Sequence, residues 1–312
     1  MLINLLPDFL AVVESADPVA AYERYFAAHH DLLSAYWHNY VLDPEGPHFH
    51  EVVGGAVRAD RADLRAVLAR VDVAALAQGA MERARAVLAA DVDVDVVLMV
   101  GVGAANAGEL VVNGRGVAFV CLEHFTSLPN AETQGLGLDP ELVPLWLAHE
   151  IAHVVRYTSP TSRSAMRTLV AEADGFYSYW ETGQRAPLRE LLMNEGLAVH
   201  VARAVSPGHA AWEYFGYARR QYARLRELEP ALARAMQPEL DRVGLGLRLR
   251  YLSGGMSDEA RTVDRYLLPD RGGYYLGARM VEPAVTAHGL PWAVRASAEE
   301  LCATSQAELA TA

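Results

Sequence analysis

His149-Glu150-Ile151-Ala152-His153 forms an HExxH pattern, and the apolar spacing around it predicts a helix. Two histidines four residues apart lie on one face of a helix, so both imidazoles can reach a single metal ion. Glu150 then lies beside any water on that ion, which is the place of a general base. The stretch therefore predicts a fold organised around a metal-binding helix.

The composition is that of a globular protein with an acidic balance. The chain has 312 residues, of which 52% are hydrophobic and 21% charged, enough for one large domain or two modest ones. A formal charge of -12 and the lack of a Lys/Arg run argue against nucleic acid as a partner. Two cysteines, Cys121 and Cys302, cannot make a disulfide framework or a cysteine zinc site.

Membrane and secretion signals are not evident in the sequence. No apolar run reaches the roughly 20 residues that cross a bilayer. The first residues, Met1 to Val12, are largely apolar but lack a basic start and a convincing cleavage site. We therefore expect a cytoplasmic protein without a membrane partner.

Strand-like segments directly precede the HExxH pattern. Residues 8–90 are mainly helical in pattern, and a β-branched run then extends from Val92 to Val102. Two further strand-like stretches lie within Leu110 to Phe125 and are separated by Asn113-Gly114, a dipeptide that favours a tight hairpin turn. We expect these strands to form a small sheet beside the motif helix.

The motif helix has two candidate starts. Asp139 can cap a helix with Pro140 in its first turn, whereas Pro144 would lie too deep in that helix and is itself a second candidate start. The helix is expected to end near Pro160. The rest of the chain is mostly helical in pattern, including a predicted helix over residues 164–180.

These elements predict an α+β, mostly helical fold. A small twisted mixed β-sheet is expected to pack on the HExxH helix, with a helical C-terminal half. The predicted organisation is a helical N-terminal region, residues 1–90, followed by a metallohydrolase domain, residues 91–312. Within that domain, residues 91–158 hold the sheet and motif helix, and residues 159–312 form a helical subdomain.

A third metal ligand is sought among the glutamates after the motif, because a catalytic zinc takes three protein ligands and leaves one position open. Glu172 lies 19 positions after His153 but points away from the apolar stripe of its predicted helix. Glu195 lies 42 positions after His153 and falls in the middle of an apolar stripe. We predict Glu195 as the ligand and keep Glu172 as the alternative.

The surroundings of Glu195 support that choice. A carboxylate on a buried face is costly unless it is paired or bound to a cation. Gly196 also weakens a helix, which is easier to understand if a backbone or ligand must approach closely. The alternative without a metal is a buried pair of Glu195 with Arg189 or Arg203.

Three short motifs carry a resemblance to a known family. They are the HExxH pattern with a following Arg156, the segment Asn194-Glu195-Gly196-Leu197-Ala198, and the GYxxG pattern Gly273-Tyr274-Tyr275-Leu276-Gly277. The second resembles the NEGFA-type segment of the aminopeptidase N family. Together, over roughly residues 92 to 290, the motifs resemble the predicted bacterial zinc-dependent proteases that share the gluzincin fold. The resemblance implies a zincin-like fold and zinc.

Two features depart from these families. The stretch between HExxH and EGLA is longer than expected, which predicts an inserted helix near residues 160–185. Gly79-Ala80-Met81-Glu82-Arg83 is similar to the aminopeptidase GAMEN motif but lies in a helical stretch before the strands. We interpret it as coincidence, so aminopeptidase activity is unsupported.

The predicted chemistry is zinc-dependent hydrolysis of a peptide or amide. His149, His153 and Glu195 would hold one Zn²⁺, and Glu150 would act as general base. The tyrosine of the GYxxG pattern, Tyr274, is the best candidate to stabilise the oxyanion, with Tyr275 kept open. An edge strand beside the metal would offer backbone groups to an extended peptide.

Two other classes of function stay open at this stage. A two-histidine-one-carboxylate site can also hold Fe(II) in an oxygenase or biosynthetic enzyme. A non-catalytic binding protein could keep the same fold, although intact HExxH and EGLA motifs argue against it. The oligomeric state is not indicated by the sequence.

Overall fold

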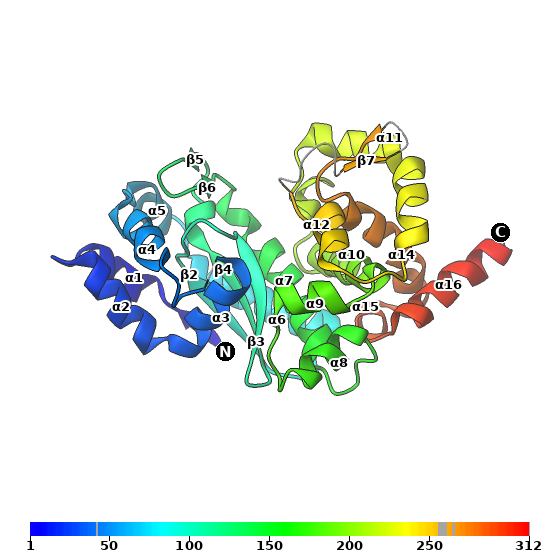
Figure 1. Ribbon diagram of the computed structural model, residues 1–312, viewed down its shortest axis with the longest axis horizontal. Coiled ribbons are helices and arrows are strands. Elements are labelled where there is room, and N and C mark those ends of the chain that lie inside the picture. Colours follow the sequence, from blue (N-terminus) through cyan, green and yellow to red (C-terminus); the bar gives the residue numbers. More distant parts are fainter. Residues whose placement is uncertain (42, 255–260, 264–265, 312) are drawn as a thin grey trace.

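The computed structural model describes residues 1–41, 43–254, 261–263 and 266–311. It confirms an α+β, mostly helical fold with one small mixed sheet (Figure 1). The first helices are α1 Leu6–Val13, α2 Pro18–Ala28, α3 His30–Tyr40, α4 Phe49–Arg58, α5 Ala62–Leu68 and α6 Val73–Leu88. The strands of the sheet are β1 Leu2–Asn4, β2 Val94–Met99, β3 Ala107–Val112 and β4 Arg115–Cys121.

The later elements are mainly helices. They are β5 Pro129–Asn130, β6 Gly135–Leu136, α7 Val143–Thr158, α8 Ala165–Glu172, α9 Tyr179–Arg185, α10 Leu188–Val205, α11 Arg219–Met236, α12 Leu245–Leu252, β7 Thr262–Val263, β8 Tyr266–Leu267, α14 Gly272–His288, α15 Leu290–Ala293 and α16 Ala298–Thr311. Over the part of the chain that is described, no helix has both the length and the apolar character needed to cross a bilayer.

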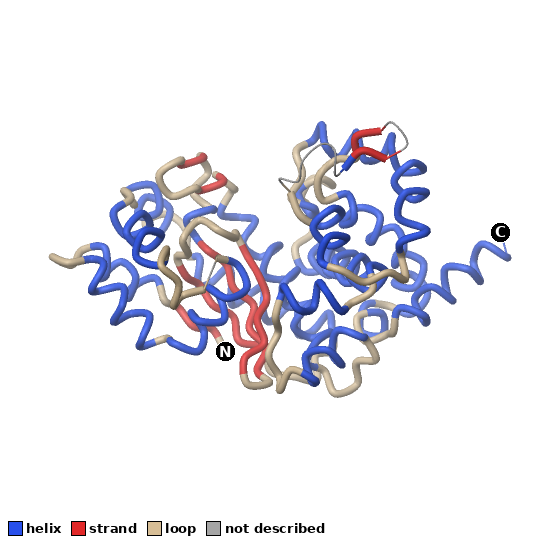
Figure 2. The backbone as a smooth tube through the Cα atoms, in the orientation of Figure 1, coloured by secondary structure: helices blue, strands red, loops and turns tan. Residues whose placement is uncertain are grey.

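The sheet has the order β1-β2-β4-β3. β2 runs parallel to β1 and β4, and β3 runs antiparallel to β4. The predicted hairpin turn joins β3 to β4, with Asn113 and Gly114 at φ 52° and 74°. The N-terminal region, predicted as helical, also contributes strand β1, whose three residues are too few to show an alternating pattern. Figure 2 shows the strands of this sheet together in one half of the molecule, whereas the short β7–β8 pair lies in the other half.

Helix α7 carries the HExxH pattern through the centre of the protein. Asp139 caps a short 3₁₀ turn that begins at Pro140, and α7 follows directly with Pro144 in its first turn, so both predicted starts are used. Every residue from Val143 to Tyr157 is buried, as expected for a helix covered on all sides. α7 packs against β3, β4, α6 and α10 and lies between the sheet and the C-terminal helices (Figure 1).

The predicted helix over residues 164–180 is wrong in its second half. α8 ends at Glu172, because Asp174 and Gly175 adopt left-handed conformations with φ 51° and 75°. The chain then runs along β3, where the Tyr177 amide donates to the Val111 carbonyl at 3.0 Å. The region between the two motifs therefore holds two short helices, α8 and α9, joined by an extended segment.

Helices α10 and α14 cross at two glycines that belong to the sequence motifs. A methyl group on Gly196 would lie 2.2 Å from the carbonyl carbon of Gly277, and one on Gly277 would lie 1.9 Å from the Leu192 carbonyl oxygen. Backbone therefore meets backbone at this point, which confirms the close approach predicted for Gly196. The crossing brings the EGLA and GYxxG segments together.

Candidate metal centre

Helices α7 and α10 bring two histidines and a glutamate to one buried point. The ligand atoms of His149, His153 and Glu195 all lie within 4.8 Å of one another. A single carboxylate oxygen of Glu195 lies 3.2 Å from Nε2 of His149 and 3.4 Å from Nε2 of His153. The three residues are only 2%, 2% and 7% exposed. These are the residues that the sequence predicts as ligands.

The electrostatics of this cluster favour an anionic Glu195. Burial alone would raise the pKa of that carboxyl, but the two neighbouring histidines hold the pKa below its usual range. Burial disfavours charge on His153, yet the carboxylate outweighs it and raises the pKa of that ring to about 9. Burial lowers the pKa of His149. A cation bound here would compete with the proton on His153, because metal ligands must be deprotonated.

The donor set fits a divalent metal ion. Two imidazole Nε2 atoms and one carboxylate oxygen are the protein ligands of many catalytic zinc sites. Nδ1 of His149 and Nδ1 of His153 are buried and have no hydrogen-bond partner within the described structure. In many metal sites that second nitrogen donates to a carboxylate or carbonyl.

Glu150 lies in the same buried region, beside a residue that the sequence interpretation missed. Glu109 on strand β3 accepts hydrogen bonds from the hydroxyls of Tyr157 at 3.2 Å and Tyr40 at 2.9 Å. Burial and then the nearby Glu109 raise the pKa of Glu150 well above its usual value. The sequence feature that could have identified Glu109 is a lone carboxylate within an apolar strand. The same kind of feature identified Glu195 as the predicted third ligand.

Of the two GYxxG tyrosines, Tyr274 lies beside the cluster. Its ring is nearly parallel to that of His149, at 20° with centroids 6.1 Å apart. Tyr275 instead donates to Glu229 on α11 at 2.6 Å and lines a separate cavity of about 780 Å³ between α10, α11 and α14. Tyr274 is therefore the tyrosine placed to act on a molecule at the cluster.

The alternatives to Glu195 lie elsewhere. Glu172 is exposed at the end of α8 and pairs with Arg185. Arg189 pairs with an aspartate after α11, and Arg203 lies over two aromatic rings. The buried pair of Glu195 with either arginine is therefore not formed.

The outer edge of β3 differs from the prediction. The hydroxyl of Tyr40 bonds to both the amide and the carbonyl of Glu109 at 3.0 Å. The carbonyl of Val111 accepts from Tyr177 at 3.0 Å. The expectation that this edge offers free backbone groups to an extended peptide is wrong at these residues, because α3 and the segment after α8 already occupy them.

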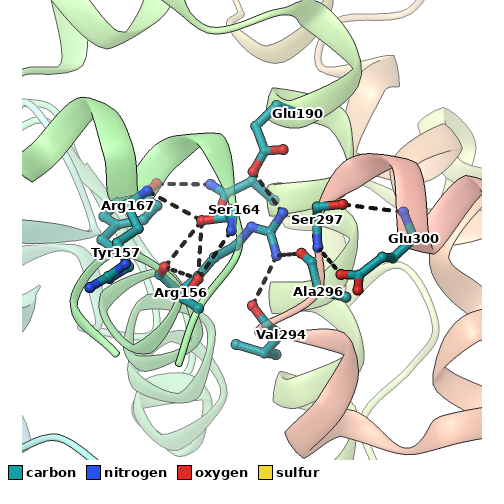
Figure 3. A network of polar contacts seen from close by, with 11 residues as sticks. Arg156, Tyr157, Ser164, Arg167, Glu190, Val294, Ala296, Ser297 and Glu300 are labelled. Atoms are coloured by element: carbon teal, nitrogen blue, oxygen red, sulfur yellow. Dashed lines mark hydrogen bonds and ion pairs between the residues drawn. The ribbon is translucent and has the colours of Figure 1, made fainter. Parts of the chain in front are cut away.

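A buried ion pair also joins α7 to α10 (Figure 3). Nη2 of Arg156 donates to Glu190 at 2.6 Å. Nη1 of the same guanidinium donates to the carbonyls of Val294 and Ala296, both at 2.9 Å. Arg156 follows the second motif histidine by one helical turn, so this link fixes the two ligand-bearing helices relative to each other.

Comparison with known proteins adds no family assignment. No protein-family model, curated protein or solved structure matches this chain. The chemistry of the site therefore rests on its own geometry.

Proposed function

We propose that this protein is a zinc-dependent metallohydrolase that cleaves peptide or amide bonds. The observation that carries the proposal is the buried convergence of His149, His153 and Glu195, with ligand atoms within 4.8 Å of one another, directly beside Glu150. Three such ligands leave one coordination position for water or substrate. When bound, Zn²⁺ supplies Lewis acidity that lowers the pKa of a coordinated water to about 7.

Glu150 is proposed as the general base. It would take a proton from the attacking water and deliver it to the departing nitrogen. Its pKa is raised by burial and by Glu109, which makes its carboxylate a stronger base and a better temporary holder of that proton. The hydrogen bonds to Glu109 from Tyr40 and Tyr157 keep this second carboxylate in place.

Tyr274 is proposed as the donor to the oxyanion. Burial, and next the negative charge of Glu195, raise the pKa of its phenol, so the hydroxyl keeps its proton and can donate it in a hydrogen bond. A donor held beside the cluster stabilises the oxygen that gains charge as the carbonyl carbon becomes tetrahedral. A base and an oxyanion donor together suit acyl transfer to water.

The first experiment is metal analysis of the purified protein and of two variants. We expect about one zinc per chain, lost in Glu195→Ala and kept in Glu172→Ala, which removes a glutamate outside the cluster. A protein that binds no metal after exposure to Zn²⁺ would contradict the proposal. Iron with oxygen consumption would favour an oxygenase instead.

The second experiment tests hydrolysis. A library of acetylated peptides would be incubated with the protein, and cleavage would be followed by mass spectrometry. Glu150→Gln should keep the metal and lose about 10²- to 10⁴-fold in rate. Cleavage by Glu150→Gln at the rate of the unaltered protein would contradict the assigned role.

A further inference from the structure

We propose that Arg271 binds a carboxylate of the substrate. The inference rests on the proposed hydrolase and names its substrate class, namely short peptides or acylated amino acids that carry a negative charge near the bond to be cut. The residue lies just before the GYxxG pattern and was not singled out from the sequence. Three observations carry the inference: its position, its lack of an ionic partner among the described residues and the occupied edge of β3.

The backbone of Arg271 places its side chain beside Tyr274. It lies at the N-terminal cap of α14 with φ 58°, a left-handed conformation uncommon outside glycine. The Tyr217 hydroxyl donates to its carbonyl at 2.6 Å. The guanidinium carbon lies 4.3 Å from the ring centroid of Tyr274, the same ring that lies beside His149. The side chain is therefore fixed next to the proposed oxyanion donor.

Gly216 leaves room for the guanidinium and for a neighbouring indole. It adopts φ 63°, and a methyl group there would lie 2.9 Å from the Trp146 ring and 3.2 Å from Nη1 of Arg271. A side chain at this position would crowd the charged group. The glycine is thus needed both for its left-handed backbone and for the space that the arginine uses.

Arg271 has no ionic partner among the residues that the structure describes, although it is partly buried. Two of the buried arginines are ion-paired, Arg156 with Glu190 and Arg295 with Asp91. Two others, Arg61 and Arg248, donate instead to carbonyls or a phenol. Burial and then the neighbouring Tyr274 and Tyr217 bear most on the pKa of Arg271. Glu195 is the carboxylate that also acts on it, and the metal would use that carboxylate. A charged donor with a planar fork and no ionic partner among the described residues is suited to a carboxylate from outside the chain.

The occupied edge of β3 is a further reason to expect that Arg271 positions the substrate. Strand addition would align a long peptide beside the metal, but Tyr40 and Tyr177 already take the outward groups of Glu109 and Val111. Another group must then fix the position of the substrate. A bidentate contact between a carboxylate and Arg271 does so with one end of a short molecule.

The kinetic test uses matched substrates. Acetylated peptides of increasing length would be compared as free acids and as C-terminal amides, with a third set carrying an internal Asp or Glu and an amidated end. We expect the unaltered protein to prefer carboxylate-bearing substrates by about 10- to 100-fold in kcat/KM. Preference for the free acids would assign the terminal carboxylate, and preference for the third set would assign an acidic side chain.

Variants then test the residue itself. Arg271→Met should abolish the preference, mainly by raising KM for the charged substrates, and Arg271→Lys should restore part of it because a point charge remains. Arg220→Met removes the same charge from an exposed position on α11 and should leave the preference unchanged. An equal loss for charged and amidated substrates in Arg271→Met, carried by kcat, would show that Arg271 only positions Tyr274 and would overturn the inference.

A binding measurement separates this inference from the proposed function. Metal-free protein would be melted with increasing succinate or its neutral diamide, succinamide. Succinate alone should raise the melting temperature of the unaltered protein and of Arg220→Met, but not of Arg271→Met. Equal responses of the unaltered protein and Arg271→Met would overturn the inference even if zinc-dependent hydrolysis is found. Absence of zinc or of Glu150 dependence would overturn the hydrolase while this measurement still reports on Arg271.

Discussion

Helices α7 and α10 share two buried ionic contacts that differ in kind. In one, Arg156 meets Glu190 at 2.6 Å and its other terminal nitrogen is taken by two carbonyls. In the other, the Nε2 atoms of both motif histidines converge on one oxygen of Glu195, and their Nδ1 atoms have no partner in the described structure. The first contact resembles a structural link. In the second contact, three possible metal-ligand atoms surround a common point, as they do in a cation site.

The largest effect is expected from breaking the structural link. Arg156→Met leaves the carboxylate of Glu190 buried without a partner, which should cost about 3–5 kcal/mol of unfolding free energy. Urea denaturation would measure it. The double variant Arg156→Met, Glu190→Met should recover most of the loss, because an apolar pair of similar volume replaces both charges. A cost of about 1 kcal/mol or less for the single variant would show that water reaches the pair.

The second contact should gain its stability from the metal. At a free Zn²⁺ concentration of 100 times the dissociation constant, the unaltered protein should gain about 2.7 kcal/mol over the chelated protein. Glu195→Ala should lose this gain, and Glu172→Ala should keep it because Glu172 pairs with Arg185 on the surface. Denaturation with and without Zn²⁺ checks the prediction. A gain that survives in Glu195→Ala would place the metal elsewhere.

The contacts that sequence could predict depend on local periodicity. The positions of His149, His153 and Glu195 follow from helical spacing, because each lies on a helix long enough to show a stripe. Gly196 was also interpreted correctly, since a glycine within a buried helix indicates a close approach. These features are encoded within a few turns of one element.

The features that were missed depend on segments far apart in the chain. Glu109 reaches Glu150 only because β3 packs on α7, and Arg271 reaches the cluster only because α14 crosses α10. The predicted helix over 164–180 ended early because Asp174 and Gly175 turn the chain toward β3, where tertiary hydrogen bonds replace helical ones. That same turn occupies the strand edge, so one local misinterpretation also led to the wrong expectation for peptide docking.

A smaller effect is expected at the glycine crossing that holds Glu195 near Tyr274. Gly277→Ala must push the Leu192 carbonyl away, because the added methyl would lie 1.9 Å from it. We expect a cost of about 1–3 kcal/mol together with weaker zinc binding, both measured by denaturation and metal titration. Gly55→Ala on α4 is the control: nothing lies within 4 Å of its added methyl, and alanine there should be neutral or stabilising. Unchanged zinc affinity in Gly277→Ala would separate the crossing from the site.

The smallest effect is expected for a more exposed ion pair at the end of α7, formed by Asp91 and Arg295. The pH dependence of its contribution to stability distinguishes it from the buried Arg156–Glu190 pair. The Asp91 carboxylate, 31% exposed, accepts from Arg295 at 2.8 Å and from Ser159 and Thr161 at 2.8 and 2.7 Å. Burial acts to raise the pKa of Asp91, but the bonds from Arg295, Thr161 and Ser159 outweigh it and lower the pKa below its usual value.

The sign of the pH effect follows from that lowered pKa. The stabilisation is present above the unfolded pKa of about 3.9 and is lost as the pH falls through the folded pKa. Asp91→Asn should therefore lower the melting temperature at pH 7 by more than at pH 3, by a few degrees at most because solvent screens the pair. Melting curves of both proteins at the two pH values measure the difference. An equal difference at both pH values would mean that Asp91 acts through neutral hydrogen bonds. Of the two contacts compared, the Arg156–Glu190 pair would then be the one that acts through charge.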